Sequence, residues 1–127
     1  MLSLTESQRI CFLAIRNVLP NIVDTGSGQN LFYNPPPKVQ MPYPRIQYTE
    51  GNVTKAHADN ISYYGNLSYE IRVLTDKPLA LDNKAKGWVD LLNDYTRTIN
   101  GKNVSITFDR VYTYDGVWNY IYKLVII

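Results

Sequence analysis

Residues 117–127 are apolar on both faces of a predicted strand, and this limits the folds open to the chain. One face would carry Val117, Ile121, Val125 and Ile127, and the other Trp118, Tyr120, Tyr122, Leu124 and Ile126. A strand of this kind needs cover on both sides. It therefore belongs in a sheet packed against helices, with something further on the other face. Asp115-Gly116 suits a type I′ turn and would join it to the preceding strand.

Two segments have helical periodicity. In residues 3–19, apolar side chains recur at Ile10, Ala14 and Val18, and Pro20 would end the helix. Residues 82–99 form the second predicted helix. Asp82 is its expected N-cap and Asn100-Gly101 its expected stop. We expect both helices to cover one face of the sheet.

The rest of the chain alternates between strands and loops. The predicted strands are 43–49, 62–75, 104–113 with a bulge near Asp109-Arg110, and 117–127. The predicted loops are 24–42, where Leu31–Tyr33 can pack as a short strand and Pro35–Pro37 forms a stiff spacer, and the polar segment 50–60. This order, α-β-β-α-β-β, predicts one α+β domain over residues 1–127, with a mostly antiparallel four-stranded sheet and two helices on one face.

The amino-acid composition argues against catalytic and metal-binding sites. The 127 residues include one Cys and one His, and the net charge is +2. Cys11 lies within an apolar pattern typical of a buried residue, and His57 lies in a predicted polar loop with no nucleophile motif nearby. We therefore expect no catalytic residues, no metal site and no cofactor. The lone Cys favours a reducing cytoplasm, and no signal peptide or membrane span is expected.

Tyrosine is the unusual component, with eleven copies. Most of them fall on predicted strands, and several would lie on a sheet face that two helices cannot cover. An exposed aromatic surface usually marks an interface. The candidate subunit-interface residues are Tyr63, Tyr69, Tyr112, Trp118, Tyr120 and Tyr122.

A binding module is the alternative class. Aromatic strands interleaved with basic residues can stack nucleic-acid bases, and Arg72, Arg110 and Lys123 lie near tyrosines. Glu70 and Asp109 are mixed among them and offset the charge. The polyproline segment could likewise be a ligand for a partner domain. A nucleic-acid- or peptide-binding module therefore stays open beside an assembly role.

Three stretches together resemble a known family. They are Met41–Tyr48 (MPYPRIQY) followed by Ala58-Asp59-Asn60, then Leu67–Lys77 (LSYEIRVLTDK), and Phe108–Gly116 (FDRVYTYDG) continuing through Asn119–Tyr122. In this order they resemble the tail-completion proteins of long-tailed bacteriophages, also called tail terminators or head–tail joining proteins. The resemblance covers about residues 41–127.

The resemblance implies a structural protein of the virion, assembled in the host cytoplasm and placed at the head-proximal end of a siphophage tail. It implies a homohexameric ring that caps the tail tube and meets a head-completion or connector protein, with DNA passing through the lumen without specific binding. No enzyme activity is implied. The 50–60 loop then becomes a candidate for contacts along the tube axis. Its candidate residues are Glu50, Lys55, His57, Asp59 and Asn60. Another head–tail connector component is the nearest alternative.

Overall fold

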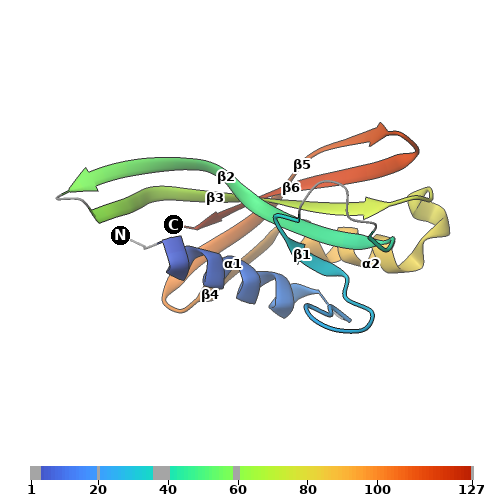
Figure 1. Cartoon of the computed structure of the whole chain (residues 1–127), viewed down its shortest axis with the longest axis horizontal. Helices are drawn as coiled ribbons and strands as arrows, with labels where there is room; N and C mark the ends of the chain where they lie inside the picture. Colours follow the sequence, from blue (N-terminus) through green and yellow to red (C-terminus); the bar gives the residue numbers. More distant parts are fainter. Residues whose placement is uncertain (1–3, 20, 36–40, 59–60, 127) are drawn as a thin grey trace.

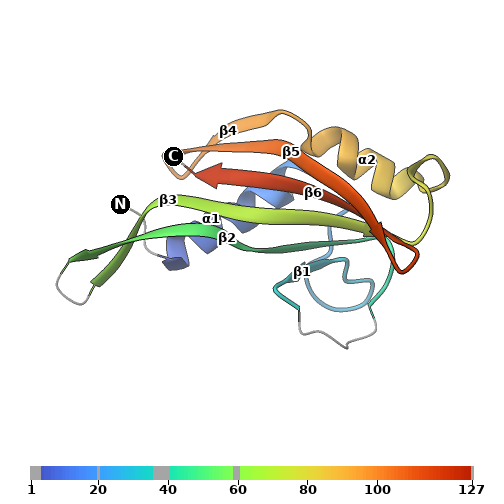
Figure 2. The same cartoon turned by 90° about the horizontal axis from the view of Figure 1, so that it is seen from above.

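The computed structural model describes residues 4–19, 21–35, 41–58 and 61–126, with the backbone alone for residues 4, 52–58 and 61–67. Its elements are α1 (Leu4–Val18), β1 (Leu31–Tyr33), β2 (Arg45–Ala58), β3 (Ile61–Thr75), a 3-10 turn (Leu79–Leu81), α2 (Asn83–Leu92), β4 (Tyr95–Ile99), β5 (Lys102–Tyr114) and β6 (Val117–Ile126). Both helices lie on the same side of one sheet, as Figures 1 and 2 show from two directions.

The sheet differs from the predicted one. It has six strands in the order β1-β2-β3-β6-β5-β4. β1 runs parallel to β2, whereas every other neighbouring pair is antiparallel. The expectation of a four-stranded sheet is therefore wrong, although the α+β class and the placement of both helices on one face are confirmed. The two additional strands are short and lie at the two edges.

One added strand comes from the predicted second helix. α2 ends at Leu92, and residues 95–99 form β4. Asp94 has a positive φ of 57°, which breaks the helix. Asn100 and Gly101 have φ values of 50° and 77° and connect Ile99 to its partner Lys102. Asn-Gly is as favourable in this two-residue hairpin turn as it is after a helix, so its position alone did not distinguish the two.

The predicted loop at 50–60 is also wrong. β2 continues to Ala58 and pairs with β3 as far as Ala58 opposite Ile61. The pairing register shifts twice, between Glu50 and Val53 and between Val53 and Lys55. Such irregularities interrupt the alternation of apolar and polar residues, so this strand reads as a polar loop in sequence. Asp59 and Asn60 lie outside the described residues.

Several local predictions are confirmed. α1 spans nearly the predicted range, and the Asp82 side chain caps α2 by accepting a hydrogen bond from the Ala85 N–H at 3.1 Å. β5 shifts register between Phe108 and Arg110, where the bulge was expected. The β5–β6 hairpin turns at Asp115 and Gly116, which have φ values of 50° and 74°. Each of these features is determined by a few residues that are adjacent in the chain, so it can be predicted from the sequence.

The core lies between the helices and the sheet. Its α1 residues include Ile10, Cys11, Ala14 and Ile15, its α2 residues Ala85, Trp88 and Leu92, and its sheet residues Ile46, Tyr69, Ile71, Val104, Ile106, Tyr122 and Leu124. Two buried tyrosines keep their hydroxyls satisfied. The Tyr122 hydroxyl donates to the Val89 carbonyl of α2 at 3.1 Å, and the Tyr69 hydroxyl shares a 2.6 Å hydrogen bond with Ser7 of α1. Burial also raises the pKa of the Cys11 thiol, consistent with a packing role.

The opposite sheet face is covered by charged side chains rather than by aromatic ones. Ile121 is fully buried there, in register with Arg72 of β3 and Arg110 of β5. Glu70 pairs with both arginines, at 3.0 Å to Arg72 and 3.5 Å to Arg110. The aliphatic parts of the two arginines account for the burial of Ile121 between them. The expected second cover for β6 is thus present, but it is a charged ladder.

Substitution of Trp88 tests whether α2 packs into the core as described. Trp88 is 1% exposed, and Trp88→Ala should lower the free energy of unfolding by about 3–5 kcal/mol because it leaves a large cavity. Leu91→Ala is a matched control on the same helix, since Leu91 is 44% exposed, and it should cost less than about 1 kcal/mol. Chemical denaturation of both variants measures the difference. Equal losses would contradict the packing described above.

Candidate assembly surface

A two-stranded arm projects from the body of the protein. β6 pairs with β3 only from Leu67 to Thr75, and β1 pairs with β2 only from Ile46 to Tyr48. Beyond these points, in the described backbone up to Ala58 and from Ile61, β2 and β3 pair only with each other. Figure 1 shows this arm extending from one end of the molecule. Its outer backbone edges are therefore available to another strand.

A polar cluster fixes the base of the arm to α1. The amide nitrogen of Gln8 lies 2.8 Å from both the Glu50 carboxylate and the Tyr33 hydroxyl. The Tyr33 hydroxyl also donates to Glu50, and the Tyr33 ring lies 5.0 Å from the Tyr48 ring. Burial alone would raise the pKa of Glu50, but hydrogen bonds from Tyr33, its own backbone and Gln8 outweigh it, and the pKa is lowered. The charged form of Glu50 thus stabilises the arm base.

The far end of β5 has an unpaired edge. β4 pairs with β5 only between Lys102 and Ile106, whereas β6 follows β5 as far as Tyr114. The segment Thr107–Tyr114, here called the β5 edge, is exposed along its whole length. It consequently presents free backbone N–H and C=O groups on the side away from β6.

Large apolar side chains gather on the β5 edge. Their exposed fractions are 46% for Phe108, 49% for Val111, 39% for Tyr112 and 75% for Tyr114. Phe108 packs edge-on against the buried Tyr122 ring, with centroids 5.5 Å apart. The Tyr112 hydroxyl accepts a hydrogen bond from Arg72 at 2.7 Å, which ties its ring to the charged ladder. Exposed apolar groups held this firmly are typical of a contact surface.

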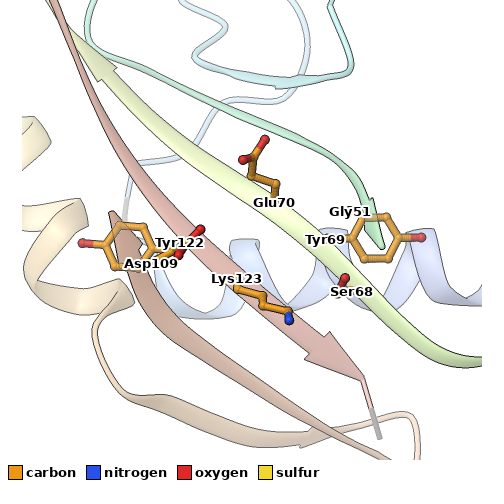
Figure 3. Close-up of a pocket in the computed structure, with 7 residues that line it drawn as sticks. All are labelled: Gly51, Ser68, Tyr69, Glu70, Asp109, Tyr122 and Lys123. Atoms are coloured by element: carbon orange, nitrogen blue, oxygen red, sulfur yellow. The ribbon is translucent and has the colours of Figure 1, made fainter. Parts of the chain in front are cut away.

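A hollow of about 310 Å³ opens on the sheet face opposite the helices (Figure 3). Ser68, Glu70, Asp109 and Lys123 contribute its polar groups. Glu70 of β3 and Lys123 of β6 are partners in the strand register. Figure 3 nevertheless shows the Glu70 carboxylate and the Lys123 ammonium pointing away from each other. Both carboxylates are engaged by arginine, Glu70 as described and Asp109 by Arg110. The acidic side chains of the hollow therefore belong to the same charged ladder as the arginines.

The predicted interface residues separate into four groups. Tyr69 and Tyr122 are about 1% exposed and belong to the core, so the expectation that they lie on an uncovered aromatic face is wrong. Trp118 and Tyr120 are half-buried, and Tyr112 is exposed on the β5 edge. Tyr63 lies in the arm, opposite Ala56. The alternation of side chains along a strand predicts which tyrosines share a face of the sheet. It does not predict which of the two faces the helices cover.

The predicted axial-contact residues do not share a loop. Glu50 lies at the base of the arm, and Lys55 and His57 lie along β2, opposite Tyr64 and Ser62. Sequence reasoning also missed Phe108 and Val111 as surface residues. The sequence did contain a signal for them. The alternation of apolar and polar residues changes phase after Arg110, which leaves apolar residues on both sides of a predicted bulge at the end of a long strand.

The described ranges contain no group of three or more His, Cys, Asp or Glu side chains placed to hold a metal ion. In the same part of the chain, no helix is long and apolar enough to cross a membrane. Neither a protein-family model nor a curated protein sequence matches this chain. The arm and the β5 edge are therefore the features from which a function can be inferred.

The arm base should be sensitive to acid. Because the pKa of Glu50 is lowered in the folded state, its stabilisation is present above the unfolded value of about 4.3 and is lost as pH falls through the folded pKa. Wild type should therefore lose more stability below about pH 4 than Glu50→Gln does. Thermal unfolding of both proteins across this range measures the difference. Identical acid profiles would show that Glu50 does not carry the charge-dependent stabilisation.

Proposed function

We propose that this chain is a ring-forming structural protein that caps the tail tube of a long-tailed bacteriophage and joins it to the head connector. The observation that carries the proposal is the β5 edge, where four large apolar side chains and a row of backbone groups are exposed together. A protein that worked as a monomer would be at risk of aggregation through such an edge. The resemblance of residues 41–48, 67–77 and 108–122 to tail terminators supplies the identity of the assembly.

The two protruding features offer two different surfaces, as the contact between neighbouring subunits of a ring requires. The arm and the β5–β6 turn lie at opposite ends of the long axis in both views (Figures 1 and 2). Contacts between two different surfaces generate a ring when the rotation between subunits closes. Six copies, as in the family that the sequence resembles, would form such a ring.

The proposed partners follow from this role. They are further copies of the chain, the tail tube protein on one side and a head-completion protein on the other, within the virion. The charged ladder alternates in sign along Arg72, Glu70, Arg110 and Asp109. A surface of mixed sign has no strong attraction for phosphates, which suits a lumen that DNA passes without being held. No enzymatic step is part of the proposal.

A peptide-binding module is the second candidate. The β5 edge favours it specifically, because an extended segment of another protein could add to this edge as a further strand. A nucleic-acid module is less well supported, since the arginines beside Tyr112 are paired with carboxylates. The two candidates differ in whether the bound strand belongs to the same protein.

Disrupting the gene tests the proposed function. In a phage that carries it, a nonsense mutation should yield overlong tails or tails without heads, because nothing stops the tube or presents it to the connector. Electron microscopy of the lysate measures tail length and the fraction joined to heads. A plasmid copy of the wild-type gene should restore both. Tails of normal length, attached to heads, would overturn the proposal.

A further inference from the structure

The protein has unpaired strand edges at both ends, and they are complementary in kind. At one end, the β5 edge lacks a neighbour beyond Ile106. At the other, the outer edge of β2 has no neighbour beyond Tyr48 among the described residues. Each is a run of extended backbone with unused donors and acceptors, which are strong groups that normally find partners.

The β5 edge has the features of a strand acceptor. It lies beside β6 in regular antiparallel pairing after the bulge, from Arg110 opposite Ile121 to Tyr114 opposite Val117. It is therefore held in an extended conformation before any partner arrives. Val111 and Tyr112 are successive residues and stand on opposite faces of the sheet. A strand added here would bury apolar surface on both of its sides.

The arm has the features of a strand donor. The open outer edge of β2 runs from Thr49 to Ala58 and is long enough to lie along all of Thr107–Tyr114. In the described backbone, its Gly51–Ala58 part pairs only on the β3 side. An isolated two-stranded hairpin is marginally stable in water, so the arm gains from a third strand. The arm strands approach closely near its base, since a Cβ at Gly51 would lie 3.0 Å from the Ser68 hydroxyl. The pairing register with β3 shifts on either side of Val53, and in the described backbone the outer edge stays open.

The two edges of one molecule cannot meet. The arm and the β5–β6 turn lie at opposite ends of the long axis, and both views agree (Figures 1 and 2). The partner for each edge must come from another molecule. A second copy supplies a strand of matching length for each, and no further component is required.

We infer that the β2 strand of the arm, Gly51–Ala58, pairs with the β5 edge, Thr107–Tyr114, of a neighbouring copy. This inference rests on the proposed function, since it names the contact that would close the ring. The sheets of neighbouring subunits then continue into one another around the assembly. Backbone pairing supplies the common register, and Phe108, Val111 and Tyr112 supply apolar contact on the two faces.

Cross-linking between two single-cysteine variants tests the contact directly. In a Cys11→Ala background, Thr54→Cys protein and Thr113→Cys protein are mixed and treated with a short thiol-specific cross-linker. We expect a cross-linked dimer that contains one chain of each kind. Thr54→Cys mixed with Leu81→Cys is the matched control, because Leu81 is 72% exposed and belongs to the 3-10 turn rather than to the β5 edge. The control mixture should give no such dimer.

Two further variants test whether the contact drives assembly. One replaces residues 52–67 by Asn-Gly, which shortens the arm to a two-residue hairpin turn between Gly51 and Ser68. The other is Val111→Lys, which places a charge on the β5 edge. Both should lose the oligomer in sedimentation experiments, whereas Leu81→Lys should keep it. Circular dichroism confirms that each variant is folded.

The outcomes separate this inference from the proposed function. If the shortened-arm protein still forms rings, or if the two mixtures cross-link equally, the arm–β5 contact is wrong, whereas a ring-forming role stands. If the wild-type protein stays monomeric at every concentration and no mixture cross-links, pairing between copies is overturned and the β5 edge serves another protein's strand. Normal tails after gene disruption would overturn the proposed function whatever the cross-linking shows.

Discussion

The double pairing of β6 holds this protein together. β6 pairs with β3 along one side and with β5 along the other, and it is the only direct link between the β1-β2-β3 and β5-β4 parts of the described sheet. Its Tyr122, Leu124 and Ile126 side chains enter the core beneath the helices. On its other face, the arginines of its two neighbours cover Ile121. Because β6 is apolar on both faces, both faces of the sheet must cover it with other side chains.

The surfaces available for assembly follow from the same arrangement, because β6 and the edge strands are shorter than the strands they accompany. β3 runs past β6 at one end, and β5 runs past β4 at the other. Each overhang leaves backbone groups unpaired, and the two overhangs lie at opposite ends of the molecule. Polar contacts join Glu50, at the base of one overhang, to Gln8 of α1, and Tyr112 of the other overhang to Arg72 of β3. In the proposed assembly, overhangs that are already extended would lower the entropic cost of association.

Local chemistry could be predicted from the sequence, whereas pairing could not. The Asp115-Gly116 turn, the bulge before Arg110 and the Asp82 cap are set by a few adjacent residues, and all three are present. Asn100-Gly101 fits two structures equally well, and only the competition between helix and strand for residues 95–99 decides between them. The burial of Tyr69 and Tyr122 depends on where the helices dock, which alternation leaves open. The assembly surfaces are properties of strand length in three dimensions and carry no motif.

The place of β6 in the chain also has a consequence for how the protein is made. β6 follows both of its partners in sequence but lies between them in space. During synthesis, β3 and β5 emerge before the strand that joins them, and the edge of each that faces β6 has no partner until β6 arrives. Contacts between residues distant in sequence slow folding, and unpaired edges at this stage can associate wrongly. The order in which ribosomes deliver the strands therefore makes premature association between nascent chains a hazard that correct assembly must avoid.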